Sequence, residues 1–209
     1  LVQDYRVAPY CPRCGTGLSD HELSQGYETI KDQSVYVKFQ ATSGKLAELN
    51  ASLLVWTTTP WTLVSNTAVA VNPKIEYQVV EITHEEKTER LVVATNLAAV
   101  LGEERKVLAT FTGAQLENTK YVAPFDLVEI PDAHYIVLAD YVTVEDGTGL
   151  VHQSPAFGAD DFAVCRKYGL PIVNPIAPDG HFLPELNLIG GVFFKDADKP
   201  LIKDLKSRG

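Results

Sequence analysis

The stretch LLVWTTTPWTLVSNTAVAV, residues 53–71, carries the strongest signal for the fold. Its two ends, 53–59 and 68–71, are rich in Leu, Val and Thr, as β-strands are. Pro60 stands between them, lacks a backbone N–H and biases Thr59 towards an extended conformation. The first strand must therefore stop at Pro60 or lie at the edge of a sheet.

On either side of this stretch, five further runs have the same β-like composition: 35–39, 77–82, 90–95, 106–112 and 134–140. Gly, Pro, Asn and charged turns separate them. This spacing favours a mostly antiparallel sheet or barrel over a doubly wound sheet. The predicted fold class is therefore β-rich α/β, a barrel-like and mostly antiparallel sheet with a few flanking helices.

Three short helices are expected beside the sheet. The clearest covers 159–168, with acidic residues in its first turn, basic residues in its last turn and Gly169 as a stop. A second covers 96–101. A third covers 199–208, with Asp198 as its N-cap.

Residues 1–33 differ from the rest, because CPRCG at 11–15 is followed by a polar stretch. We expect an N-terminal appendage there, leading into one globular unit over 34–209, with the Pro- and Gly-rich region 171–200 on its surface. A length of 209 residues suits a single domain. The sequence contains no methionine, so we expect it to be a piece excised from a longer protein.

The composition is that of an ordinary globular protein, 45% hydrophobic and 22% charged. No apolar run is long enough for a membrane span, and no leader for secretion opens the chain. Three cysteines, two of them close together, make no disulfide framework and fit the reducing cytoplasm. The net charge of −9 would repel a long nucleic-acid backbone, so we expect this chain to bind only a small part of any nucleic acid.

The first candidate site is WTTTPWTLVSN, residues 56–66. Thr57, Thr58 and Thr59 place hydroxyl groups on both faces of a strand as it ends. Such hydroxyls and the nearby backbone amides are ready donors for a carbonyl or an oxyanion. A threonine is also a common strand residue and Trp61 a common core residue, but three threonines between two tryptophans make that reading weaker.

The second candidate site is GTGLVHQSPAFGADDF, residues 147–162. His152 and Ser154 would share one face of a short strand, because side chains alternate. Asp160 and Asp161 would lie in the first turn of the following helix as surface-facing carboxylates. One carboxylate satisfies the helix dipole, which leaves the other free to bind a cation.

Other hydrolase patterns are missing from the sequence. It has no HExxH motif and no GxSxG elbow, so Ser154 has little support as a nucleophile. Cys11 and Cys14 in CPRC form half of a tetrahedral zinc knuckle, and the remaining ligands would have to come from outside this chain.

The two candidate sites together resemble the paired signature of the isoleucyl-tRNA synthetase editing domain, also called connective peptide 1. The segment CPRCGTGLSDHE resembles the lead-in to that domain, and the resemblance runs from about residue 7 to about residue 182. Valyl and leucyl relatives place arginine and acidic residues where this chain has TPW at 59–61. The chain departs from the family at Val64, Ser154 and Phe162, which are usually proline, alanine and tyrosine.

The resemblance implies roles for particular residues. The threonines at 57–59 would line the hydrolytic pocket, Trp61 would form part of its wall, and Asn66 would support the strand end. His152 would set the size limit for the substrate side chain. Asp161 would pair with the α-ammonium group of the substrate.

The resemblance also implies a substrate, valine wrongly esterified to the 3′ end of tRNA(Ile), with valyl-adenylate as a second one. A synthetic site for isoleucine rejects valine by only about 1–3 kcal/mol, a magnitude for which isoleucyl-tRNA synthetase itself is the standard example. An activated ester needs only a positioned water, donors to its carbonyl and a carboxylate for the ammonium. No cofactor is expected for editing; ATP and Mg would serve only the synthetic site of the parent synthetase, which is itself an expected partner.

Two alternatives stay open at the level of sequence. The chain could be a non-catalytic β-barrel module for tRNA binding or assembly, which would hydrolyse no aminoacyl ester. It could also be a serine hydrolase that uses Ser154 and His152, which would be sensitive to Ser154→Ala.

Overall fold

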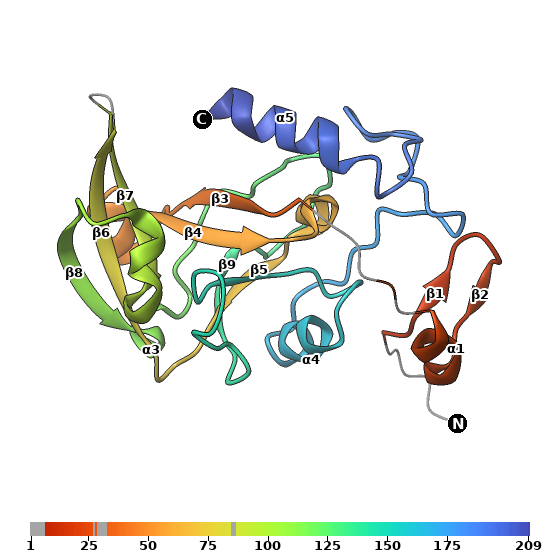
Figure 1. Cartoon of the computed structure of the whole chain (residues 1–209), viewed down its shortest axis with the longest axis horizontal. Coiled ribbons are helices and arrows are strands. Elements are labelled where there is room, and N and C mark those ends of the chain that lie inside the picture. The colour runs from red at the N-terminus through yellow and green to blue at the C-terminus, as the bar shows by residue number, and fades with distance from the viewer. Residues whose placement is uncertain (1–6, 27, 29–32, 85–86) are drawn as a thin grey trace.

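Two β-sheets form the body of the protein in a computed structural model that describes residues 7–26, 28, 33–84 and 87–209 (Figure 1). The larger sheet has five strands in the order β3-β4-β7-β6-β8, and the smaller has three in the order β10-β5-β9. Their bounds are β3 Val35–Gln40, β4 Ser52–Thr57, β5 Ala68–Val71, β6 Glu76–His84, β7 Lys87–Ala94, β8 Lys106–Thr112, β9 Tyr135–Leu138 and β10 Val151–Gln153. Each run that the sequence predicted as a strand is one.

Most neighbouring strands pair antiparallel, as predicted, but two pairs are parallel. β4 runs parallel to β7, and β5 runs parallel to β9. Within the described residues neither sheet closes on itself. The predicted fold class is therefore confirmed as mostly sheet with flanking helices, while the barrel is an open one built from two sheets.

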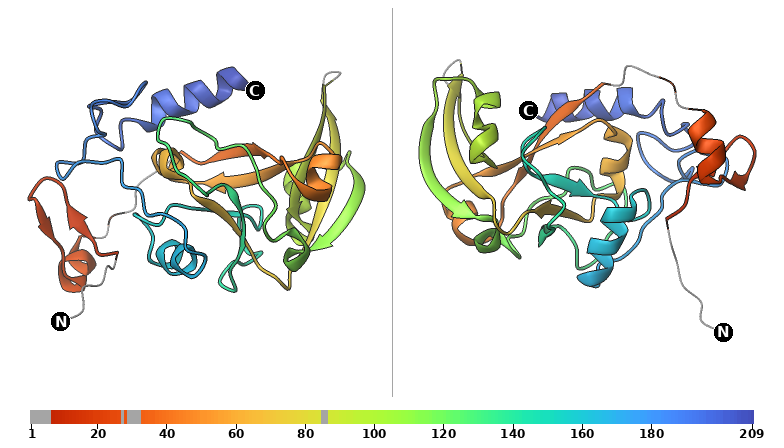
Figure 2. Two further views of the ribbon diagram at one scale, coloured as in Figure 1. Left: turned by 180° about the vertical axis from the view of Figure 1, so that it is seen from behind. Right: turned by 60° about the horizontal axis from the view of Figure 1, so that its bottom comes forward.

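The predicted helices are present as α4 (Ala159–Lys167), the 3-10 helix η2 (Thr95–Leu101) and α5 (Asp198–Arg208). Four short helices were not predicted from the sequence, namely α1 (Asp20–Gln25), α2 (Gly44–Glu48), the 3-10 helix η1 (Pro60–Ser65) and α3 (Gly113–Leu116). In Figures 1 and 2, α5 lies along one side of the β3–β4 pair and α4 along the other side of the molecule.

The prediction that Asp198 is the N-cap of the last helix is wrong. Asp198 is the first residue of α5, whose N-cap is Ala197 with no side-chain hydrogen bond. The Asp198 carboxylate instead accepts a hydrogen bond from the backbone N–H of Trp61, at 2.9 Å. That N–H belongs to the first turn of η1, where a helix has unsatisfied donors. Asp198 therefore joins the C-terminal helix to the candidate site.

The N-terminal residues form a small unit at one end of the molecule (Figures 1 and 2). It consists of β1 (Tyr10–Cys11), β2 (Thr16–Gly17) and α1 (Asp20–Gln25). None of the residues of α1 is buried, and the helix is held by a capping box in which Ser19 and Glu22 bond each other's backbone. The division of the chain into 1–33 and 34–209 stays a prediction.

A continuous core joins the two sheets and includes Phe39, Val55 and Ile136, all fully buried. The region before α5 was expected on the surface, yet it contributes Phe182 and Ile189 to this core. The core is therefore closed partly by chain without regular structure.

Tyr77 and Gly149 fix the loop that carries the second signature. The buried hydroxyl of Tyr77 donates to the Gly149 carbonyl at 2.8 Å. Gly149 has φ +76°, and a Cβ there would meet the Cβ of Ala94 at 2.5 Å. Only glycine allows both this backbone conformation and this close approach to β7. The loop is thereby held against the larger sheet.

Candidate active site

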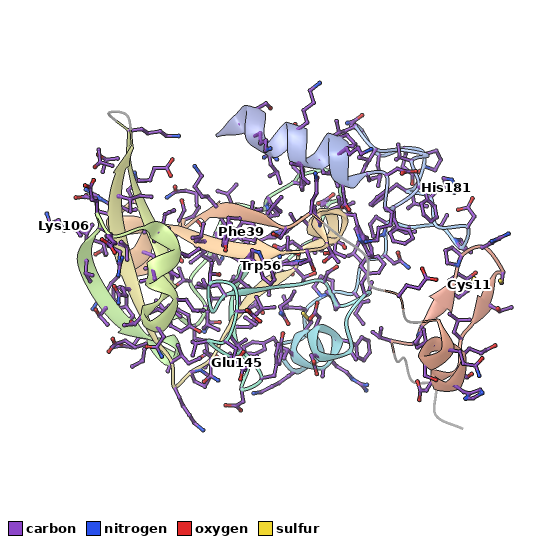
Figure 3. The ribbon with its side chains drawn as sticks, in the orientation of Figure 1. Cys11, Phe39, Trp56, Lys106, Glu145 and His181 are labelled. Carbon is purple, nitrogen blue, oxygen red and sulfur yellow. The ribbon has the colours of Figure 1, made fainter. Side chains whose placement is uncertain are left out.

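A cleft of about 460 Å³ lies where β4 ends, between η1, the loop over 141–150 and the start of α4. Trp56, near the middle of the molecule in Figure 3, lines it. The cleft brings together residues from both sequence signatures, although the two are far apart along the chain. Its lining includes Thr57, Thr58, Thr59, Trp61, His152 and Asp161.

The three threonines differ in the freedom of their hydroxyl groups. Thr57 is buried and its Oγ1 accepts a hydrogen bond from the backbone N–H of Thr59 at 3.1 Å. The hydroxyls of Thr57 and Thr59 are 3.3 Å apart. Thr58 is exposed, and within the described part of the chain its hydroxyl has no hydrogen-bond partner. Thr58 therefore keeps its full capacity to bond a ligand.

Thr62 connects the threonine turn to His152. It is buried, lies one turn after Thr59 in η1, and its hydroxyl donates to the Thr59 carbonyl at 2.8 Å. The same oxygen is 2.9 Å from Nε2 of His152. Because the hydroxyl has a single proton, this arrangement makes Nε2 of His152 the donor and leaves Nδ1 as an acceptor. Thr62 thereby fixes the orientation of the imidazole.

His152 is a neutral part of the cleft wall. It sits in β10 with 8% of its surface exposed. Burial lowers the pKa of His152 to about 4, because a charged ring would lose its solvation. The ring is therefore uncharged at neutral pH and forms part of the lining of the cleft.

Asp161 is less exposed than the sequence suggested. Its carboxylate accepts a hydrogen bond from the backbone N–H of Ser154 at 2.9 Å, and the residue is half-buried. Burial, together with the nearby Asp160, raises the pKa of Asp161 to about 6 even though the Ser154 N–H stabilises the ionised form. Asp160 itself is exposed. A partly desolvated carboxylate in a cleft has a strong need for a cationic partner.

Trp61 forms an aromatic wall beside these groups. Its ring centroid is 4.8 Å from that of Phe157 and 4.7 Å from that of Phe194, both edge-to-face. The indole N–H is buried without a partner among the described residues. The packing holds the ring rigid and apolar at this side of the cleft.

Asn66 and Ser154 serve the framework. Asn66 does not line the cleft; it accepts from the Tyr121 hydroxyl at 2.7 Å and donates to the Ala68 carbonyl at 3.0 Å, which supports the start of β5. Ser154 is buried and its hydroxyl is 2.7 Å from that of Ser65, whereas His152 bonds Thr62. The described residues thus contain no Ser154–His152 pair of the kind a serine hydrolase needs.

Sequence reasoning did not single out Thr62, Tyr141 or Phe157, which also line the cleft. Thr62 was visible within the quoted motif, three residues after Thr59, but no helix was expected there. The hydroxyl of Tyr141 bonds the Gln153 amide at 2.7 Å, and burial raises its pKa. Its sequence context has no signal that separates it from a core tyrosine.

The two cysteines of the knuckle lie on the outlying hairpin, where Figure 3 labels Cys11. The Cys11 sulfur accepts a hydrogen bond from the Cys14 backbone N–H at 3.3 Å. Hydrogen bonds from Cys14 lower the pKa of Cys11, which favours the thiolate that zinc binds. In the parts of the chain that are described, no third His, Cys, Asp or Glu joins them. The pair can supply two of the four ligands of a tetrahedral zinc.

The sequence of this β-rich chain matches the family model of a class of editing domains. Residues 31–191 match the family described as leucyl-tRNA synthetase, editing domain, and the chain belongs to this family. The crystal structure described as GlLeuRS-CP1 has the same fold, with a TM-score of 0.64 at 18% identity over 84% of this chain and 96% of that one. The P. knowlesi cytosolic leucyl-tRNA synthetase editing domain gives 0.61 at 13% identity, over 88% and 96%.

In sequence the chain is highly similar to isoleucyl relatives. It is 64% identical to the isoleucine–tRNA ligase of Streptomyces coelicolor and 44% identical to that of Thermus thermophilus, in both cases over 100% of this chain. The chain spans about a fifth of the length of these relatives. These matches confirm the resemblance to isoleucyl-tRNA synthetase editing domains. None of the helices described is long and apolar enough to cross a membrane.

Proposed function

We propose that the cleft hydrolyses valine from mischarged Val-tRNA(Ile), as the editing domain of an isoleucyl-tRNA synthetase. The observation that carries the proposal is that Thr58, His152 and Asp161 line one cleft. They supply, in that order, a hydroxyl group free to bond a ligand, an uncharged imidazole in the wall and a partly desolvated carboxylate. The family and the isoleucyl relatives support it. Valyl-adenylate, which presents the same valyl group, is a second candidate substrate.

The chemistry needs no covalent intermediate. Water attacks the ester carbonyl carbon, the bond from that carbon to the ribose oxygen breaks, and the ribose oxygen takes up a proton. The products are free valine and tRNA with a free terminal hydroxyl. In this proposal the Thr58 hydroxyl donates to the carbonyl oxygen as negative charge develops there.

Asp161 binds the α-ammonium group of the amino acid. At neutral pH a carboxylate with a pKa of about 6 is mostly ionised, and its desolvation makes an ammonium partner favourable. This contact fixes one end of the amino acid. The wall formed by His152 and Thr62 then limits the length of its side chain.

Release of valine from Val-tRNA(Ile) by this chain tests the proposal. Wild-type chain should release valine, and Asp161→Ala should lose nearly all of that activity because the substrate is no longer held. Asp160→Ala is the matched control, since Asp160 is exposed in the same helical turn. Equal activity in the two variants, or no valine released by the wild type, would refute the proposed function.

The remaining partners and ligands are part of the same proposal. The 3′ end of aminoacylated tRNA is the nucleic-acid partner, and the rest of the synthetase makes most of the binding contacts with the tRNA. Zinc on Cys11 and Cys14, with two ligands from elsewhere, would serve the appendage and not the hydrolysis.

A further inference from the structure

The outer face of the β3–β4 pair continues away from the cleft. Tyr36 pairs with Trp56 and Lys38 with Leu54 in the antiparallel register. Because side chains alternate along a strand, Trp56, which lines the cleft, shares a face with Tyr36 and Lys38. Tyr36 is 50% exposed. Lys38 lies two residues, or about 7 Å, further from the cleft.

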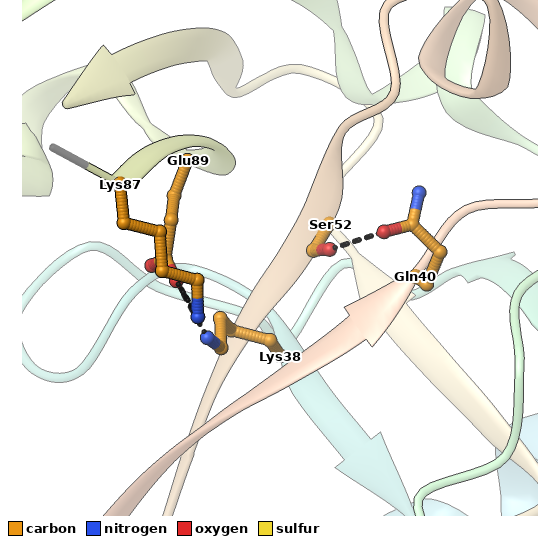
Figure 4. Close-up of polar contacts among 5 residues, drawn as sticks. All are labelled: Lys38, Gln40, Ser52, Lys87 and Glu89. Carbon is orange, nitrogen blue, oxygen red and sulfur yellow. Dashed lines mark hydrogen bonds and ion pairs between the residues drawn. The ribbon is translucent and has the colours of Figure 1, made fainter. Parts of the chain in front are cut away.

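Cations gather where this face meets β7. The ammonium groups of Lys38 and Lys87 lie 2.9 Å and 3.1 Å from the same carboxylate oxygen of Glu89 (Figure 4). Among the side chains that the structure describes in this groove, two ammonium groups on one carboxylate leave one positive charge uncompensated. Arg90, paired with Glu81 at 3.0 Å, lines the same groove of about 470 Å³.

The groove also offers neutral donors. Ser52 and Gln40, which bond each other at 3.0 Å, line it as well (Figure 4). The described residues that line it include three cations, Lys38, Lys87 and Arg90, and one acid, Glu89, while Glu81 outside the lining pairs with Arg90. The chain as a whole has a net charge of −9. A local excess of cations on an acidic domain marks a place where a polyanion can approach.

We propose that Trp56, Tyr36, Lys38 and Lys87 form a track for the single-stranded 3′ end of the tRNA whose acylated terminus occupies the cleft. Proteins that bind single-stranded RNA combine aromatic rings that stack on bases with cations that follow the phosphates. Along this face the aromatic residues Trp56 and Tyr36 lie next to the cleft, and the cationic residues Lys38 and Lys87 lie beyond them. The track rests on the proposed function, and it explains how an acidic domain can hold the end of a nucleic acid.

The test is binding of a short single-stranded oligoribonucleotide with the 3′-terminal tRNA sequence, measured by fluorescence anisotropy over a range of salt concentrations. The double variant Lys38→Gln/Lys87→Gln should bind more weakly. Its plot of log affinity against log salt should be shallower by about 1.4, since each phosphate contact on a single strand contributes about 0.7. Tyr36→Leu should weaken binding about tenfold, whereas Tyr36→Phe should not.

The matched control is Lys45→Gln/Lys106→Gln, which removes the same charge from exposed positions outside the groove; Lys106 is on β8, away from Trp56 in Figure 3. Equal losses in the two double variants, or no loss in either, would overturn the track. Tighter binding of an acidic peptide than of the RNA would overturn it in favour of a protein partner. Asp161→Ala should bind the oligoribonucleotide normally but should not deacylate Val-tRNA. Binding therefore tests the track, and deacylation tests the proposed hydrolytic function.

Discussion

At the scale of single residues, the candidate site contains polar groups whose hydrogen-bonding capacity is not fully used within the described structure. The hydroxyls of Thr57 and Thr59 lie within hydrogen-bond distance of each other, whereas the Thr58 hydroxyl has no partner in the described structure. Asp161 is a desolvated carboxylate that receives one backbone hydrogen bond from Ser154. Both groups were proposed from the sequence, but only the structure shows which hydrogen bonds each of them makes.

Thr58→Val should reduce deacylation of Val-tRNA by about 100-fold, the usual effect of losing one oxyanion-type donor. Valine preserves the shape of the side chain and removes only the hydroxyl. Thr57→Val should act more through the local structure, because Thr57 is buried and bonds the turn. Single-turnover rates measure the difference. If valine at each of positions 57, 58 and 59 leaves the rate unchanged, the donor lies elsewhere.

The pH dependence of the reaction should follow Asp161. Its pKa is about 6 in the folded chain, so the rate should fall as pH drops below about 6 and the carboxylate takes up a proton. Stability has the opposite trend. The folded pKa lies above the ordinary value of 3.8, so the folded state binds more protons and loses relative stability as pH rises from about 4 to about 6.

Asp161→Asn removes both effects. Its residual rate should be flat across this range, and its unfolding free energy relative to wild type should increase from about pH 4 to about pH 6. Rate–pH profiles and urea unfolding at several pH values measure the two. A wild-type profile without a limb near the Asp161 pKa would mean that another group binds the ammonium.

At the scale of elements, η1 is the piece that assembles the site. Its 3-10 geometry places Thr62 and Ser65 three residues apart on one face, where they meet His152 and Ser154 of the β10 region. The sequence predicted that the strand before η1 stops at Pro60 or lies at the edge of a sheet; β4 stops at Thr57 and lies between β3 and β7. The sequence did not predict η1 itself, since six residues of 3-10 helix have no periodic signature of their own.

Asp198→Ala should lower the free energy of unfolding by about 1–2 kcal/mol, as expected for losing a charged partner of a helix N-terminus. The bond from the Trp61 N–H to Asp198 links η1 to α5. Thermal and urea unfolding measure the loss, with Asp196→Ala as the control because Asp196 is exposed two residues earlier. An equal effect in both variants would mean that the link contributes nothing.

At the scale of the whole molecule, the strands were predictable and their arrangement was not. Runs rich in Val, Ile, Thr and Tyr identify β3 and β6 from sequence alone, and β3 buries one face, whereas β6 buries Val79 and Val80 on opposite faces at a register shift. The parallel pairings of β4 with β7 and β5 with β9 depend on contacts distant in sequence, for which no local pattern exists. The cleft between the two signatures depends on that arrangement.

Selection of the substrate by the size of its side chain is the central claim of the proposed function, and the variant His152→Ala tests it most directly. Isoleucine is one methylene longer than valine, and forcing it against a packed wall costs about 1–3 kcal/mol, equivalent to roughly 10- to 100-fold in rate. With its wall shortened, the variant should hydrolyse correctly charged Ile-tRNA and retain much of its activity on Val-tRNA. Deacylation rates on the two charged tRNAs decide the matter. If Ile-tRNA stays intact while Val-tRNA hydrolysis is lost, His152 takes part in the chemistry and selection by size is wrong.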